Sequence, residues 1–351
     1  MRKQSSDTLL VSRFLDACNG HPVDRPPIWL MRQAGRYLPE YREIRKGHTM
    51  LEAVSNPELA AEITMQPIRR VGFDAAILFS DLTVKFTKMG APFSIVEGIG
   101  PVVEHPVRSE ADVEGLRFIE PSFDLPYVLE SIRLLKRELD VPLIGFTGAP
   151  FTLAAYLIEG GPSKDHRRTR SMMRDSPAWW HQLMELLSEN VARFLAAQLE
   201  AGADAVQVFD SWIGVLDEAT YREFVLPHMK PIFRQLAAFQ KPVIHFGTGT
   251  SELLPVMQEA GGTVMGVDWR LSLGAASNRL RSTPLQGNLD PAVLLTNPGV
   301  IRRHAEEVVR QGRGLPGHIF NLGHGIFPET PIEHVQVLVE TVQEVLHTAH
   351  V

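Results

Sequence analysis

Residues 176–210 read SPAWWHQLMELLSENVARFLAAQLEAGADAVQVFD. Ser176 and Pro177 are typical of the start of a helix, and Gly202 is typical of its end. Between them, apolar residues recur at helical spacing and form one stripe, made of Leu187, Val191, Phe194 and Leu195. The short apolar run 205–209 then has the character of a buried parallel strand. This stretch therefore predicts a long helix followed by a buried strand.

The same alternation recurs along the whole chain. Helical stretches separate most of eight short apolar runs, which are 28–31, 75–79, 142–146, 205–209, 242–246, 264–269, 284–287 and 318–322. Eight strands alternating with helices favour an α/β fold of the (β/α)8 TIM-barrel type, and a doubly wound open sheet is the alternative. No Ser-, Pro- or Gly-rich linker divides the chain, so we expect one domain over residues 1–351. Residues 1–27 predict an added helix before the first strand, with one apolar side formed by Leu10, Phe14, Leu15 and Cys18.

Composition excludes several classes of function. Lys plus Arg number 35 and Asp plus Glu number 41, so the formal net charge is -6 and gives no global attraction for nucleic acid or an anionic membrane. A single cysteine, Cys18, forms no intramolecular disulfide and builds no thiolate metal site alone, and we expect it to be a small core residue. The apolar run near the N-terminus is too short for a signal peptide, and no run approaches the roughly 20 residues of a membrane span. We expect a cytoplasmic protein.

Polar residues follow the predicted strands, where barrel enzymes place their chemistry. Arg32 and Arg36 flank Gly35 after the first strand, and they would form an anion clamp in a loop, one face of a helix, or two ion pairs with nearby acids. Asp81 after the second strand is either a helix N-cap or a buried carboxylate facing a cavity. His324, between two glycines after the last strand, is a turn residue, a packing residue or a ligand contact. The His and acidic residues show no recognised metal-binding spacing, so no metal site is predicted.

Two long motifs resemble the signatures of one enzyme family. Residues 27–42, PIWLMRQAGRYLPEYR, and residues 145–160, GFTGAPFTLAAYLIEG, are similar to the two signatures of the uroporphyrinogen decarboxylases. Three shorter motifs match in the family's order: FSD at 79–81, FDS at 209–211 and NLGHG at 321–325. The resemblance extends from about residue 5 to residue 345.

The resemblance implies a single-domain (β/α)8 barrel that forms a homodimer and needs no metal or organic cofactor. It implies conversion of uroporphyrinogen III to coproporphyrinogen III, with loss of CO2 from the four acetate side chains. A corrinoid-linked methyltransferase on the related barrel is one alternative, but those enzymes use a zinc-held thiolate and Cys18 lies far from any strand end. A non-catalytic tetrapyrrole-binding protein is another, and the presence of Asp81 with both arginines argues against it.

The resemblance also assigns roles to individual residues. Asp81 would face the pyrrole nitrogens and stabilise positive charge on the ring. Arg32 and Arg36 would pair with substrate carboxylates and count as catalytic with Asp81, although arginine is a poor acid and the proton donor stays open. The remaining substrate contacts implied are Gln33, Ala34, Gly35, Tyr156, Ser211 and His324. Phe79, Phe146 and Phe209 would line the pocket, the alternative being that a Phe ending a strand belongs to the core.

Residues 160–166, GGPSKDH, depart from the family's usual glycine-rich, aromatic-containing loop. The basic residues that follow, Arg167, Arg168, Arg170 and Arg174, predict a solvated basic face, or a surface that steers a polyanionic substrate.

Overall fold

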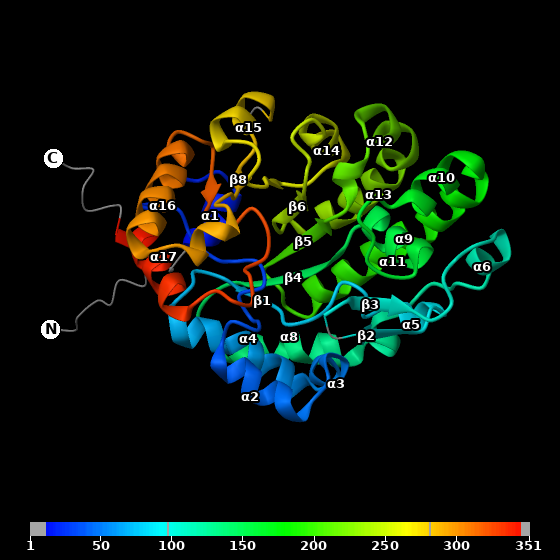
Figure 1. The fold of residues 1–351 in the computed structure, drawn as a ribbon, viewed down its shortest axis with the longest axis horizontal. Helices are drawn as coiled ribbons and strands as arrows, with labels where there is room; N and C mark the ends of the chain where they lie inside the picture. Colours follow the sequence, from blue (N-terminus) through cyan, green and yellow to red (C-terminus); the bar gives the residue numbers. More distant parts are fainter. Residues whose placement is uncertain (1–11, 97, 281, 345–351) are drawn as a thin grey trace, which may run out of the picture.

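Within the computed structural model, which describes residues 12–96, 98–280 and 282–344, seven parallel strands form one curled sheet in the order β1-β4-β5-β6-β7-β8-β9. Figure 1 shows the helices arranged around these central strands. The strands are β1 (Ala76–Ile77), β4 (Leu143–Gly148), β5 (Ala205–Asp210), β6 (Val243–Gly247), β7 (Val264–Gly266), β8 (Leu285–Gln286) and β9 (His318–Ile319). No described helix is both long and apolar enough to cross a membrane.

The segment around Ile28 closes the sheet into a barrel. Ile28 forms a single parallel bridge with Phe320, which directly follows β9. On its other side, the backbone carbonyl of Ile28 accepts a hydrogen bond from the Asp74 amide at 2.9 Å, just before β1. The predicted α/β barrel is confirmed, and the open sheet is excluded. The predicted first strand, 28–31, is wrong in extent: the Ile28 amide donates to the Asp74 side chain at 2.9 Å, and the chain turns directly afterwards, with the Gln33 amide bonded to the Leu30 carbonyl at 3.0 Å.

Helices cover the outside of the barrel, and β2 (Phe93–Val96) and β3 (Gly100–Val103) form a separate antiparallel pair that the sequence did not predict. The α-helices are α1 (Arg13–Cys18), α2 (Pro39–Gly47), α3 (Met50–Ser55), α4 (Pro57–Val71), α5 (Phe86–Met89), α6 (Glu110–Glu114), α7 (Pro121–Asp124), α8 (Pro126–Glu138), α9 (Pro150–Glu159), α10 (Arg167–Asp175), α11 (Pro177–Glu200), α12 (Glu218–Phe224), α13 (Leu226–Leu236), α14 (Leu254–Ala260), α15 (Leu273–Arg279), α16 (Pro298–Gly312) and α17 (Ile332–Glu344). Three short 3-10 helices are η1 (Ile213–Val215), η2 (Ala237–Phe239) and η3 (Pro291–Leu295).

The helix and strand predicted from residues 176–209 are confirmed as α11 and β5. The predicted apolar stripe is buried, with Leu187, Val191 and Leu195 completely inaccessible. Ser176 occupies the N-cap position, but its side chain makes no capping hydrogen bond. Pro177, with its fixed backbone angle, therefore starts the helix without help from a side-chain cap.

The N-terminal helix closes the amino end of the barrel. Phe14, Ala17 and Cys18 of α1 pack in one apolar cluster with inward-facing strand residues such as Ala205 and Val264. The helical extension predicted over residues 1–27 is thus seen as a single short helix, and Leu10 lies outside the described residues. Cys18 is 1% exposed, which confirms it as a core residue. With this end plugged, the opposite, carboxyl ends of the strands are left for chemistry.

Candidate active site

Two arginines with free charges lie on the loop that follows Ile28. Residues 31–37 form turns and α2 begins at Pro39, so Arg32 and Arg36 belong to a loop and not to a helix. Arg32 adopts a left-handed backbone with φ 64, a conformation that is uncommon for a residue other than glycine. A Cβ at Gly35 would lie 2.7 Å from the Arg32 carbonyl oxygen, so the turn requires glycine there. Neither guanidinium forms an ion pair or a hydrogen bond with a described residue, which excludes the salt-bridge alternative.

Arg32 lies near Arg36, Tyr156 and Asp81, whose charges act on it, and we call this group of residues the recess. Its side chain is accessible to solvent, yet burial by surrounding protein atoms lowers the pKa of its guanidinium. The charges of Tyr156 and Asp81 act to raise that pKa, and the charge of Arg36 lowers it further. The recess therefore holds two uncompensated positive charges at the carboxyl end of the barrel.

Asp81 follows β1 and presents one free carboxylate oxygen. Its Oδ1 accepts hydrogen bonds from the backbone amide of Thr83 at 2.8 Å and from the Thr83 hydroxyl. The next helix, α5, starts five residues later with Lys85 at its N-cap position, so the helix-cap alternative is wrong. The Oδ2 atom accepts no hydrogen bond from any described residue. One oxygen thus fixes the carboxylate in a turn, and the other is left for a ligand.

Tyr156, on α9, stands beside the two charges. Burial raises the pKa of its hydroxyl to about 12, and Asp81 acts in the same direction. Its ring packs edge-on against Trp212, with centroids 6.0 Å apart, and Trp212 also contacts His166 at 5.3 Å. Tyr156 is therefore a protonated hydrogen-bond donor held in a fixed orientation. Ser211 lies next to Trp212 and is half-buried, with its carbonyl accepting from the Thr248 hydroxyl at 2.6 Å.

His324 approaches Arg32 from the loop after β9. Burial, and then the charges of Arg32 and Arg270, lower the pKa of its imidazole to about 4. The Gly325 amide donates to His324 Nδ1 at 2.6 Å, so the neutral ring carries its proton on Nε2. His324 is consequently a neutral donor, suited to a carboxylate. A Cβ at Gly325 would lie 2.5 Å from Arg32 Cδ, so this glycine makes room for the arginine side chain.

Two of the predicted residues lie outside the recess. Gln33 is fully buried: its Oε1 accepts from the Leu30 amide at 3.0 Å and its Nε2 donates to the Ala75 carbonyl at 3.0 Å. Its side chain is therefore held by backbone groups, and the expected substrate contact of Gln33 stays a prediction. Phe79 is 6% exposed and packs edge-on against Tyr41 of α2 at 5.7 Å, which agrees with the alternative that it belongs to the core.

Phe146 and Phe209 differ from Phe79 because they point into the barrel. Both are half-buried, and their rings pack edge-on with centroids 5.5 Å apart. Phe209 also contacts Phe246, and all three rings pack in the apolar interior of the barrel. That these two rings line the pocket stays a prediction. Ala34 and Gly35 are half-buried within the arginine loop.

Sequence reasoning missed Lys85 as a residue of the site. It is completely buried behind Asp81, its amine donates to the Thr147 hydroxyl, and its Nζ lies 5.4 Å from the centre of the Phe194 ring. Burial lowers the pKa of Lys85 to about 7, and the Asp81 charge opposes that shift. The signal in the sequence was a lone lysine inside the otherwise weakly polar stretch 82–86.

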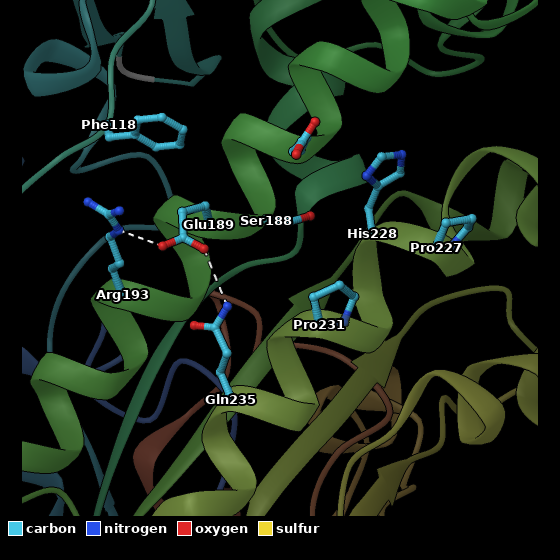
Figure 2. Close-up of a pocket in the computed structure, with 9 residues that line it drawn as sticks. Phe118, Ser188, Glu189, Arg193, Pro227, His228, Pro231 and Gln235 are labelled. Atoms are coloured by element: carbon cyan, nitrogen blue, oxygen red, sulfur yellow. Dashed lines mark hydrogen bonds and ion pairs between the residues drawn. The ribbon is translucent and has the colours of Figure 1, made fainter.

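Two pockets lie away from this recess. One, of about 540 Å³, lies between α11 and α13 and is lined by residues such as Phe118, Arg193 and His228 (Figure 2). The other, of about 600 Å³, lies near the starts of β6 and β7. Neither contains a predicted site residue. Among the described residues, no group of three His, Cys, Asp or Glu side chains is placed to hold a metal ion.

The basic segment after residue 164 forms α10. Arg167 is exposed and pairs with Asp165 at 3.0 Å, while Arg174 reaches the Thr220 hydroxyl at 3.1 Å. These contacts agree with a solvated basic face.

The comparisons with known proteins point to one family. The family model described as "Uroporphyrinogen decarboxylase (URO-D)" matches residues 10–345. A protein named uroporphyrinogen decarboxylase from Thermus thermophilus is 55% identical over 332 residues, covering 95% of this chain and 97% of that protein. One of the same name from Sorangium cellulosum is 52% identical over 336 residues, covering 95% and 96%.

Solved structures share the fold at lower identity. A methyltransferase from Methanosarcina mazei has a TM-score of 0.80 at 24% identity, covering 95% of this chain and 98% of its own. A B12-independent methionine synthase from Shewanella has a TM-score of 0.53 at 12% identity, covering 83% and 87%. These likenesses concern the barrel alone.

Proposed function

The chain belongs to the uroporphyrinogen decarboxylase family, and from this premise we propose that it removes the four acetate carboxyl groups of uroporphyrinogen III as CO2 to give coproporphyrinogen III. The observation that carries the proposal is the recess itself, where Asp81, with one free carboxylate oxygen, and the unpaired Arg36 both act on the unpaired guanidinium of Arg32. A substrate that carries many carboxylates on pyrrole rings needs cationic groups to bind the carboxylates and an anionic group to bind the pyrrole N–H groups. The alternative that depends on a zinc-held thiolate gains no support, because Cys18 is buried in the core at the other end of the barrel.

The reaction needs a place for the electrons of the breaking bond. Protonation of a pyrrole ring carbon gives a cationic ring. When the bond from the acetate methylene to its carboxylate breaks, the electron pair moves into that ring and CO2 leaves. A second proton then adds to the exocyclic methylene to form a methyl group, and the ring returns the first proton, so each cycle consumes one proton in total.

Asp81 would stabilise the cationic ring. Its Oδ2 is available for pyrrole N–H donors, while the bonds from Thr83 to Oδ1 hold the carboxylate in place. A fixed charge aimed at developing opposite charge, in a site that excludes water, is among the strongest catalytic devices. Because the ring is its own electron sink, the chemistry asks for no organic cofactor.

The other residues would bind carboxylates. Arg32 and Arg36 offer planar forks that suit bidentate pairing. Tyr156 and neutral His324 would donate single hydrogen bonds, with Ser211 nearby, and the rings of Phe146 and Phe209 would contact the apolar part of the macrocycle. In this arrangement the cations orient the substrate and Asp81 acts on the reacting ring.

Anaerobic incubation with uroporphyrinogen III and no added cofactor tests the proposal. We expect stepwise loss of mass through the intermediates with seven, six and five carboxylates to the product with four, seen by chromatography after oxidation to porphyrins. Unchanged uroporphyrinogen after prolonged incubation with folded protein would contradict it. Light scattering of the same preparation tests the proposed homodimer, and fractionation of cells tests the proposed cytoplasmic location.

A further inference from the structure

Arg270 follows β7 and is held in a fixed orientation while half of its side chain is open to solvent. Its guanidinium lies over the Trp269 ring at 3.9 Å from the ring centre, and its Nη1 donates to Asp268 Oδ2 at 2.6 Å. The Arg270 side chain is 50% exposed, whereas that of Asp268 is 2% exposed. Stacking and pairing together remove most of the freedom that an exposed arginine would have.

Asp268 is fully occupied by this arrangement. Its Oδ1 accepts from the Arg270 amide at 3.0 Å, and its Oδ2 accepts from the Gly249 amide as well as from the guanidinium. The guanidinium, by contrast, uses only Nη1 in bonds to described residues. Its Nε and Nη2 protons are left for a ligand, and two such donors match the two oxygens of a carboxylate.

The free edge of Arg270 belongs to the same end of the barrel as the recess. Trp269 packs edge-on against His324, with ring centroids 6.4 Å apart. Arg270 and Arg32 both act on His324, since each of their charges lowers the pKa of its imidazole. One side of the carboxyl end of the barrel therefore carries Arg32, His324, Trp269 and Arg270, each near the next.

We propose that Arg270 is a third carboxylate-binding arginine of this site, which pairs with a peripheral side-chain carboxylate of the substrate, away from the ring that reacts. The inference rests on the proposed function. Uroporphyrinogen carries an acetate and a propionate on each pyrrole ring, so Arg32 and Arg36 leave most of its carboxylates without a cationic partner. A contact to a peripheral group acts alike on the bound substrate and on the transition state, so it lowers KM and leaves kcat unchanged.

The test compares three variants by steady-state kinetics with uroporphyrinogen III. Arg270→Gln should raise KM about tenfold, the effect of losing one charge-assisted pairing, with kcat within about twofold of the parent. Arg270→Lys should fall between, because an ammonium keeps the charge but not the fork. Arg193→Gln is the matched control: Arg193 also lies over an aromatic ring, Phe118 at 5.1 Å, and pairs with Glu189 at 2.7 Å, but it lines the pocket between α11 and α13 (Figure 2) and should leave KM unchanged.

Three outcomes overturn the inference in distinguishable ways. If the parent enzyme turns over normally and Arg270→Gln has the same KM as the parent, Arg270 does not bind the substrate. A fall in kcat and Tm at constant KM would show that Arg270 only ties the β6 and β7 loops together through Asp268. A folded parent with no turnover would contradict the proposed function, and the inference with it.

Discussion

At the scale of single residues, neither arginine of the first loop forms an ion pair with a described carboxylate, whereas about half of the described arginines do. Arg13, Arg25, Arg117, Arg193, Arg222 and Arg310 all lie in ion pairs. Arg32 and Arg36 do not, and the loop that carries them holds Arg32 in an unusual left-handed backbone conformation. Strain kept together with unsatisfied charge is typical of a ligand site.

Arg36→Lys should weaken turnover although the charge is kept. A lysine ammonium presents a point charge and cannot reproduce the two parallel donors of the guanidinium. We expect kcat/KM to fall about tenfold or more, with the Tm unchanged, since Arg36 is exposed and unpaired. Kinetics equal to those of the parent would show that Arg36 does not touch the substrate.

Lys85→Met should stabilise the protein, and most at pH 6. Burial lowers the pKa of Lys85 from its ordinary value of 10.5 to about 7, so between these values the unfolded chain binds a proton that the folded chain does not. The free energy of unfolding therefore rises with pH across this window, and the full cost of the buried charge is present below it. The stability gained by Lys85→Met should be roughly 3–5 kcal/mol at pH 6 and should shrink toward pH 10. Urea unfolding of both proteins across this range checks it, and a gain that does not depend on pH would contradict it.

At the scale of elements, the loop after β9 supports the first loop. Gly325→Ala would place a methyl group 2.5 Å from Arg32 Cδ and should displace that side chain. We expect kcat/KM to fall about tenfold with a small change in Tm, because the backbone at Gly325 has no positive φ that alanine would strain. Gly274→Ala in α15 is the control, since a Cβ there meets nothing within 4 Å, and it should leave activity intact. Equal kinetics for both variants would mean that Arg32 can move without loss.

The elements that the sequence predicted best are those whose signal is local. The helix α11 has a proline start, a buried stripe and a glycine just beyond its end, so its bounds were predicted within about a residue. The extent of the strand at 28–31 was predicted less well, because its one parallel bridge joins Ile28 to Phe320 and the Ile28 amide donates to the Asp74 side chain, both partners distant in sequence. The β2–β3 pair was missed since its residues are partly exposed and lack the continuous apolar run of the barrel strands.

At the scale of the whole molecule, the barrel brings together residues from distant parts of the chain. The rule that chemistry lies at the carboxyl ends of the strands predicted Arg32, Asp81, Tyr156 and His324, which the structure brings near one another. It did not predict that the Gln33 side chain bonds the backbone or that Phe79 packs against Tyr41, because these contacts depend on how distant segments pack together. The proposed carboxylate-binding role of Arg270 depends on its stacking over Trp269, and no pattern in the sequence predicts that contact.

Dialysis of the whole enzyme against a chelator should leave turnover unchanged. The charges proposed for the reaction come from side chains, and the described residues contain no cluster of three metal-binding groups. Activity assayed before and after dialysis checks this. Activity that is lost on dialysis and restored by one particular metal would contradict the cofactor-independent mechanism.

The central claim is that the negative charge of Asp81 drives the reaction, and the kinetics of Asp81→Asn test it most directly. Asparagine keeps the size of the side chain and still accepts a hydrogen bond from Thr83, but it removes the charge. The account predicts that kcat falls about 10²–10³-fold with a much smaller change in KM, and that Asp81→Glu, with the charge displaced by one methylene, retains intermediate activity. A stable Asp81→Asn enzyme with the kcat of the parent would contradict the claim.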